Sequence, residues 1–192
     1  GTLPKIFDKS QYDVRVVIPN YMCIPWEYRE KMITTAYFNM DMPSGSIYVG
    51  VKTLEMNGII YYFIDNERYF SGNSPYYNLF EDLERFIYFS KAALSILPVI
   101  DFRPDIIHCH DWQAGLVPVY LNTIFQGNMF YQGIRTVMTI HNLQFQGVWD
   151  IPYIRGISGL PNECFAPDRV GKDRTDASML KGGLVYSDYI TT

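Results

Sequence analysis

Hydrophobic and polar residues alternate along the first third of the chain in a way that predicts β-structure. The run from Asp13 to Pro19 is rich in β-branched residues and stops at a proline, which predicts a buried strand. Residues 46–64 predict a β-hairpin, because apolar residues alternate on either side of Asn57-Gly58, a pair that tolerates the positive φ of a tight turn. Residues 2–8 read as the end of a helix, and residues 65–78 as a polar and aromatic loop.

The rest of the chain alternates helical and strand patterns. One helix is expected over residues 80–97, ending at Pro98, because these residues fall on one face: Leu83, Phe86, Ile87, Ser90, Leu94 and Leu97. Strands are expected over 106–110, 135–140 and 189–192, helices over 113–125 and 176–187, and a loop-rich segment over 149–175. Parallel strands need such helical crossovers, so the sequence predicts an α/β fold with a parallel sheet, flanking helices and the hairpin.

The composition fits a packed globular protein. The 192 residues are 48% hydrophobic and 19% charged, which argues against disorder. A net charge of −4 without a basic stripe argues against nucleic acid as a partner, and the lack of a run of about 18 apolar residues argues against a membrane span. The three cysteines form no CxxC pair, so we expect reduced thiols and a cytoplasmic location.

Two polar residues come directly after predicted parallel strands. Asp111 follows residues 106–110, and His141 follows residues 135–140. Ligands of open α/β sheets bind at the carboxyl ends of the strands, so both residues are candidates for a functional site. Two other interpretations stay open, namely that Asp111 caps the helix after it and that His141 is a hydrogen-bonded structural residue.

The segment after His141 is rich in amides. Asn142, Gln144 and Gln146 alternate with two apolar residues. Amide and imidazole groups can donate and accept hydrogen bonds, as sugar hydroxyls do, so the segment predicts a sugar-binding surface.

The HCHD segment of residues 108–111 also resembles a metal-binding cluster. His108 and His110 lie two apart on a strand and therefore face the same side, a spacing that metal sites use. The alternative is that one or both histidines pack within the sheet. No GxGxxG or GxxxxGK[ST] phosphate-binding motif occurs, and Lys181-Gly182-Gly183 is expected to allow close helix packing.

Six motifs, in order along essentially the whole chain, resemble those of bacterial glycogen synthases and plant starch synthases. The most specific are HCHDWQAGL at 108–116 and TIHNLQFQG at 139–147. The others are Gly1–Pro4, Asp13–Tyr21, Gly72–Tyr76 and Met179–Gly183. Each motif alone is modest, but all of them in the correct order argue strongly against chance.

This resemblance implies a fold and an activity. The family has two Rossmann-like domains that face a cleft, the GT-B fold, and residues 1–192 would be most of the first, truncated at both ends. The family transfers glucose from ADP-glucose to the non-reducing end of an α-1,4-glucan such as glycogen, with retention and without a metal or other cofactor. The family's cationic groups for the diphosphate lie outside this chain, partly in the missing C-terminal domain. The isolated chain is therefore expected to be inactive.

The resemblance also implies roles for single residues. His141 matches the family's catalytic-site histidine, which contacts the donor glucose, and Asp111 matches an aspartate implicated in activity. Tyr76 matches a loop tyrosine near the sugar. Asn142, beside the histidine, and Gln144 complete the expected substrate-binding residues. No metal ligand is expected.

Three alternatives stay open. The first is a metal-dependent hydrolase that uses His108, His110, Asp111 and His141. The second is a non-catalytic glucan-binding module, and the third is another two-domain glycosyltransferase such as sucrose synthase. The two longest motifs favour the glycogen and starch branch.

Overall fold

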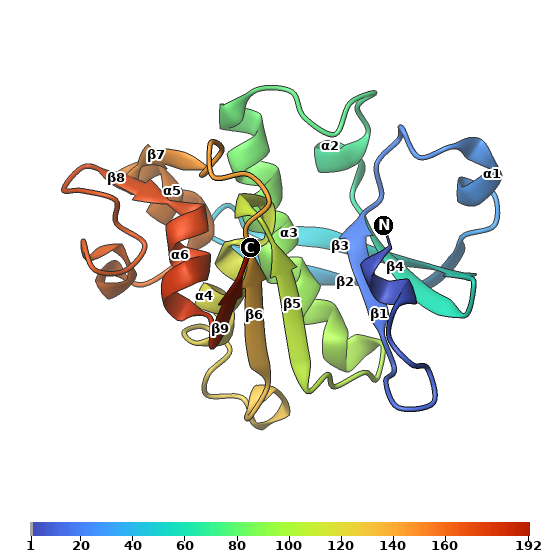
Figure 1. The fold of residues 1–192 in the computed structure, drawn as a ribbon. Coiled ribbons are helices and arrows are strands. Elements are labelled where there is room, and N and C mark those ends of the chain that lie inside the picture. The colour runs from blue at the N-terminus through green and yellow to red at the C-terminus, as the bar shows by residue number, and fades with distance from the viewer. Residues whose placement is uncertain (1) are drawn as a thin grey trace. The chain divides into compact units, whose positions relative to one another are not determined.

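The computed structural model describes residues 2–192, which form two compact units. The first unit contains residues up to Met40 and Ile47–Tyr77, and the second contains Asp41–Ser46 and Asn78–Thr192. Figure 1 traces the elements of both units along the chain. Each unit is built around its own sheet.

The sheet of the first unit has four strands in the order β1 (Arg15–Pro19), β4 (Ile59–Asp65), β3 (Gly45–Met56) and β2 (Ile33–Met42). β1 runs parallel to β4, and β3 runs antiparallel to it. The hairpin between β3 and β4 turns at Asn57 and Gly58, whose φ angles are 53° and 68°. The predicted strand and hairpin are therefore confirmed, whereas β2 was not predicted.

Short helices precede β1, join β1 to β2 and follow β4. They are η1 (Leu3–Lys5), α1 (Trp26–Arg29) and α2 (Glu67–Phe70). The expected helix end over residues 2–8 is only one 3₁₀ turn, so that prediction is wrong in extent. The predicted loop over 65–78 contains α2, because the side chain of Asn66 accepts a hydrogen bond from the amide of Arg68 and so caps a helical turn.

The second unit contains a parallel sheet in the order β5 (Ile106–His110), β6 (Arg135–Thr139) and β9 (Tyr189–Thr191), and Figure 1 shows these strands side by side. All three strands were predicted. The helices α4 (Leu116–Leu121) and α6 (Met179–Tyr186) lie between them in the chain. This arrangement confirms the predicted α/β fold with a parallel sheet.

The longest helix is α3 (Leu79–Val99), which contains the predicted helix 80–97. Asn78 caps its first turn by accepting a hydrogen bond from the amide of Glu81. Pro98 lies inside its last turn rather than after it. The predicted face is buried in the core of the unit: Leu83, Phe86, Ile87, Ser90, Leu94 and Leu97.

Three other boundaries differ from the prediction. The helix expected over 113–125 is split into η2 (Trp112–Ala114) and the shorter α4. The helix expected over 176–187 begins only at Met179, because residues 176–178 form β8 (Asp176–Ser178), which pairs with β7 (Val148–Asp150). The segment expected to be loops contains α5 (Ile151–Ser158), which Asp150 caps. Two 3₁₀ turns complete the unit, η3 (Met129–Tyr131) and η4 (Asn162–Phe165).

Glycines let α6 pack closely against the segment before α4. A Cβ added to Gly115 would overlap the carbonyl oxygen of Met179, and a Cβ added to Gly183 would lie 3.1 Å from the Cα of Gly115. A Cβ on Gly182 would lie 3.0 Å from the side chain of Val119. The prediction that Lys181-Gly182-Gly183 allows close packing is therefore confirmed.

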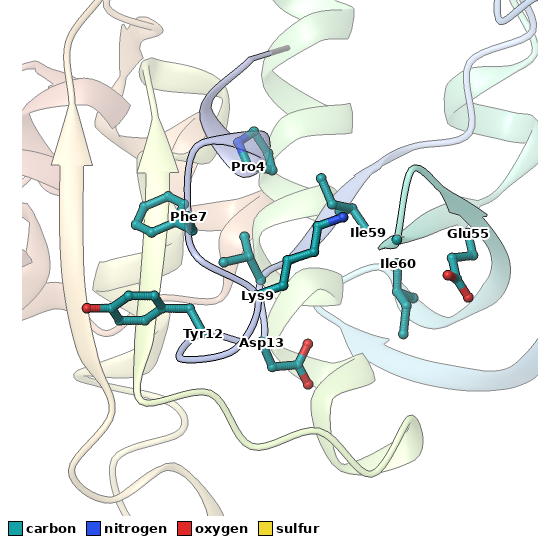
Figure 2. Close-up of a pocket in the computed structure, with 10 residues that line it drawn as sticks. Pro4, Phe7, Lys9, Tyr12, Asp13, Glu55, Ile59 and Ile60 are labelled. Carbon is teal, nitrogen blue, oxygen red and sulfur yellow. The ribbon is translucent and has the colours of Figure 1, made fainter.

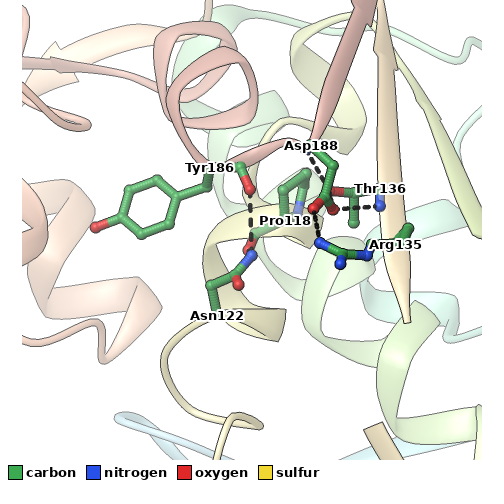
Figure 3. A network of polar contacts seen from close by, with 6 residues as sticks. All are labelled: Pro118, Asn122, Arg135, Thr136, Tyr186 and Asp188. Carbon is green, nitrogen blue, oxygen red and sulfur yellow. Dashed lines mark hydrogen bonds and ion pairs between the residues drawn. The ribbon is translucent and has the colours of Figure 1, made fainter. Parts of the chain in front are cut away.

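One carboxylate ties together the amino ends of β6 and β9 (Figure 3). Asp188 accepts hydrogen bonds from the amide and hydroxyl of Thr136, at 2.8 and 3.1 Å, and pairs with the Arg135 guanidinium at 2.6 Å. Nearby, the Asn122 amide donates to the carbonyls of Pro118 and Tyr186. These hydrogen bonds to Asp188, from the Thr136 amide first and the Arg135 side chain next, lower the pKa of its carboxyl. The network fixes the register of the two strands at the end where they begin.

A search of residues 2–192 finds no helix that combines the length and the apolar character needed to cross a membrane.

Candidate functional site

Asp111 stands at the carboxyl end of β5 with an unusual backbone. Its φ is 56° and its ψ is −174°, a region that non-glycine residues seldom occupy and that costs about 1–3 kcal/mol. Its amide donates to the carbonyl of Thr139, at 2.9 Å, which anchors the turn on β6. Strain of this kind persists only where surrounding contacts maintain it.

The carboxylate of Asp111 bridges the ends of the two strands. Its Oδ1 accepts hydrogen bonds from the backbone amides of His141, at 2.7 Å, and Asn142, at 3.2 Å. The interpretation of Asp111 as a cap for the following helix is wrong, because η2 receives no side-chain cap. The expectation that Asp111 and His141 lie together at the carboxyl edge of the sheet is confirmed.

Three histidines form a column along this edge. Nδ1 of His110 and Nε2 of His141 are 3.0 Å apart, and their rings are stacked at an angle of 22°. His108 stacks on His110 with a centroid distance of 4.3 Å, which confirms that the two side chains share one face. Nε2 of His108 lies 2.6 Å from the hydroxyl of Thr139.

The surroundings of His108 and His110 favour the neutral form of both imidazoles. Burial lowers the pKa of His108 below its ordinary 6.5, and the proximity of His141 lowers it further. Burial also lowers the pKa of His110, as do His108 and His141, while the Asp111 carboxylate acts in the opposite direction. A neutral imidazole carries one donor and one acceptor nitrogen, so a neutral His110 can donate to or accept from His141 at their 3.0 Å contact.

These histidines do not make up a metal centre. Within residues 2–192, no group of three or more histidine, cysteine or acidic side chains is arranged to hold a metal ion. The ring nitrogens of His108, His110 and His141 named above face Thr139 or one another rather than a common point. The metal-dependent hydrolase alternative therefore receives no support.

The amide-rich segment after His141 is held firmly by its backbone. Oδ1 of Asn142 accepts from the Gln144 amide at 2.9 Å. The carbonyls of Gln146 and Gly147 accept from the first amides of α6, each at 3.1 Å. Gly147 has a φ of 58°, and a Cβ there would overlap the ring of Trp112. This anchoring leaves the side chains of His141, Asn142 and Gln144 exposed to solvent.

Tyr76 lies outside the unit that contains these residues. It belongs to the first unit, where its amide lies 3.3 Å from the hydroxyl of Ser74 and its side chain is exposed. The other four predicted residues, Asp111, His141, Asn142 and Gln144, all lie in the second unit. The sugar-binding role of Tyr76 stays a prediction.

Sequence reasoning did not name two residues that the structure places beside the predicted ones as candidates for sugar binding. His110 was considered as a metal ligand or as a residue packed within the sheet, although its place two residues after His108 already put it on the face of the strand that ends at Asp111. Trp112 lines a pocket of about 270 Å³ together with Gln144, Phe145 and Gln146. A tryptophan directly after a site aspartate was the available signal.

A second pocket, of about 220 Å³, lies in the first unit (Figure 2). Phe7 and Tyr12 line it and contact each other edge to face, with a centroid distance of 5.7 Å. Nζ of Lys9, which also lines it, donates to the carbonyl of Asn57. None of the predicted site residues lines this pocket.

Comparison with known proteins decides the family. The family model described as the starch synthase catalytic domain matches residues 1–192. The chain belongs to the starch synthase catalytic domain family. The predicted resemblance is thereby confirmed, and the sucrose synthase and binding-module alternatives receive no support.

Relatives in this starch synthase family include enzymes named glycogen synthase. One from Lachnospira eligens is 58% identical and one from Lachnoclostridium phytofermentans is 56% identical, each over all of this chain and 40% of the relative. Among solved structures, the catalytic domain of starch synthase IV from Arabidopsis thaliana, bound to ADP and acarbose, superposes with a TM-score of 0.79 at 25% identity. That match covers 99% of this chain and 39% of the other, and it supports the predicted fold as part of a GT-B enzyme. The chain thus spans about 40% of the length of these relatives.

Proposed function

We propose that the protein is a glucosyltransferase that moves glucose from ADP-glucose to the non-reducing end of an α-1,4-glucan, with retention of configuration. Membership of the starch synthase family and 58% identity to a glycogen synthase support this proposal. The observation that carries it is the Asp111 carboxylate, which holds the backbone of His141 and Asn142 at the carboxyl edge of the sheet. Ligands of such sheets bind at this edge.

His141 and Asn142 would bind hydroxyl groups of the donor glucose. Both side chains are exposed and start from backbone amides that Asp111 fixes. Fixing the sugar aligns its anomeric carbon with the incoming hydroxyl, a positioning effect that can lower the barrier substantially. Asp111 would act mainly as a positioning residue, and its negative charge near the site would also favour the positive charge that develops on the anomeric carbon.

The diphosphate of the donor requires groups beyond those of this chain. The diphosphate of ADP-glucose would be held by cationic groups elsewhere in the full-length protein, since this chain contains no phosphate-binding motif. No metal would be required, because charge on the leaving diphosphate can be balanced by such side chains. A cytoplasmic location is proposed as well, in keeping with the free thiols of Cys23, Cys109 and Cys164.

The test is glucose transfer to glycogen by the full-length protein, with ADP-glucose and UDP-glucose as donors. We expect transfer from ADP-glucose that survives EDTA, and a loss of about 100-fold or more in kcat for His141→Ala. Asp105→Ala is the control, because Asp105 is exposed just before β5, at the opposite end of that strand. An unimpaired His141→Ala enzyme would remove His141 from the site, and no transfer from either donor would refute the proposed function.

A further inference from the structure

The side chain of His141 meets a second imidazole, that of His110 on the neighbouring strand β5. Nε2 of His141 lies 3.0 Å from Nδ1 of His110, and the ring centroids are 5.3 Å apart. An imidazole has two ring nitrogens, each of which can make one hydrogen bond. Since this contact occupies Nε2 of His141, Nδ1 is the nitrogen left for a hydroxyl of the donor sugar.

The ring of His110 is itself held in place from the other side. It stacks on the ring of His108 with a centroid distance of 4.3 Å and an angle of 29°. Nε2 of His108 lies 2.6 Å from the hydroxyl of Thr139, which lies 2.5 Å from the hydroxyl of Thr191. The histidine column therefore starts from contacts that cross all three strands of the sheet. Groups supported in this way keep one rotamer and can orient a neighbour accurately.

The register of the parallel sheet explains why these side chains meet. His110 lies opposite Thr139 of β6, and Thr139 lies opposite Thr191 of β9. His141 comes two residues after Thr139, a spacing that keeps side chains on one face of an extended segment. The ring of His141 thus emerges on the face that already carries His110.

The contact couples the protons of the two rings. A neutral imidazole has one N–H and one bare nitrogen. If His110 donates from Nδ1, Nε2 of His141 must accept, and a neutral His141 then carries its proton on Nδ1. If His110 accepts instead, the proton of His141 lies on Nε2, and Nδ1 is free to accept from a sugar hydroxyl. In either case the tautomer of His110 sets the tautomer of His141.

A charge on His110 would disturb this arrangement. Burial lowers the pKa of His110 below its ordinary 6.5, and His108 and His141 lower it further, while Asp111 acts in the opposite direction. A protonated His110 has no bare nitrogen and could only donate to His141. Its charge would also oppose the positive charge that develops on the anomeric carbon during transfer.

We propose that His110 is a positioning residue for His141. It holds the ring of His141 with Nδ1 turned to the donor glucose, and it determines which nitrogen of that ring carries the proton. This inference rests on the proposed glucosyltransfer. It extends the proposed function, because His110 acts through His141 and has no contact with the sugar in this assignment.

The first experiment measures glucose transfer by the full-length protein with two substitutions of His110. His110→Phe keeps a flat ring for the stack but has no nitrogen, so kcat should fall about 10-fold to 100-fold, with the KM for glycogen unchanged. His110→Gln keeps both a donor and an acceptor and should restore kcat to within about threefold of the wild type.

The pH profile of kcat provides a measurement that a purely structural role would not change. In the wild type, kcat should fall as the pH drops below 6.5 and His110 takes up a proton. Glutamine cannot be protonated in this range, so His110→Gln should show a weaker fall. An identical fall in the two proteins would contradict the role of His110.

Nitrogen-15 NMR of the full-length protein tests the contact without any catalysis. With the His141 signals assigned by comparison with His141→Ala, one tautomer of His141 should dominate in the wild type at pH 7.5, and His110→Phe should show a mixture of both. His108→Phe is the matched control, because it changes the same column and keeps the stack, but its ring nitrogens do not meet His141. The tautomer of His141 should stay unchanged in this variant.

These measurements separate the inference from the proposed function. A tautomer change in His110→Phe, in a protein that transfers glucose from neither donor, would refute the activity and support the coupling of the two rings. Three results would overturn the inference: a wild-type kcat in His110→Phe, equal losses in His110→Phe and His110→Gln, or an unchanged tautomer of His141 in His110→Phe.

Discussion

Two aspartates hold opposite ends of strand β6 by the same means. Asp188 accepts a backbone amide hydrogen bond from Thr136 where the strand starts, and Asp111 accepts one from His141 just after it ends. The other groups around the two carboxylates differ. Asp188 pairs with Arg135 at 2.6 Å, whereas the Asp111 carboxylate lies next to the histidine column and its own backbone has a positive φ.

This difference separates a carboxylate that stabilises the sheet from one that shapes a site. At the amino end, the charge of Asp188 is balanced by a cation and its hydrogen bonds join two strands. At the carboxyl end, Asp111 has a strained backbone, and its carboxylate holds the backbone amides of His141 and Asn142. Strain combined with exposed polar side chains is typical of functional sites.

The largest expected effect is the loss of activity on removing Asp111. Asp111→Ala should lower kcat about 100-fold in the full-length enzyme, because the amides of His141 and Asn142 lose their common acceptor and the site loses its geometry. Asp111→Asn keeps an acceptor oxygen and should lose less. The measurement is kcat at saturating ADP-glucose and glycogen.

A glycine at position 111 separates the effect of the lost carboxylate from the effect of backbone strain. Asp111→Gly removes the carboxylate but tolerates a φ of 56°, so it should be more stable to urea than Asp111→Ala while remaining as inactive. Full activity in Asp111→Gly would show that the carboxylate has no role in the site.

Removal of Asp188 should affect stability instead of activity. Asp188→Ala leaves the buried amide and hydroxyl of Thr136 without this acceptor, which is expected to lower the free energy of unfolding by about 1–3 kcal/mol. Urea denaturation measures this loss, with Asp105→Ala as the control. A near-normal kcat at low temperature should accompany it. An inactive but fully stable Asp188→Ala protein would contradict the distinction between the two ends.

The smallest expected effect is a pH dependence of the free energy of unfolding that differs between the two ends of β6. The lowered pKa values of His108 and His110 mean that the unfolded chain binds more protons, so stability falls as the pH drops below about 6.5. The lowered pKa of Asp188 removes stability in a separate window, below its ordinary 3.8. Urea denaturation at pH 7.5 and 5.5 should show a decrease that His110→Gln reduces and Asp188→Ala does not. Equal decreases in both variants would refute this assignment.

The sequence predicted the strands that matter for the site because their patterns are local. Residues 106–110 and 135–139 are short runs rich in β-branched residues, so the positions of Asp111 and His141 at strand ends could be inferred directly. Strand β2 escaped prediction because Met40 and Met42 are its buried residues while most of the rest are exposed, which leaves little apolar periodicity. Helix α5 was missed because Pro152 suggests a loop, although proline is well tolerated in the first turn of a helix.

The contacts within the site could not be predicted in the same way. The bond between His110 and His141 joins residues 31 apart in the chain, and no local pattern encodes such a distance. The positive φ of Asp111 is likewise imposed by tertiary contacts, namely the Thr139 carbonyl and the amides that follow β6. The local sequence favours Asp111 as a cap for the helix that follows it. In the structure its carboxylate instead accepts hydrogen bonds from the amides that follow the neighbouring strand β6.

The anchoring of Gln146 and Gly147 on the start of α6 has a mechanical consequence. Helix α6 has no room to slide, because Gly115 and Gly183 bring its backbone into contact with the turn that follows Asp111. The amide-rich segment, the helix and that turn are therefore expected to move as one rigid body. A bulky residue at Gly115 would overlap the Met179 carbonyl and push the start of α6 away, which would shift the amide-rich segment that follows His141.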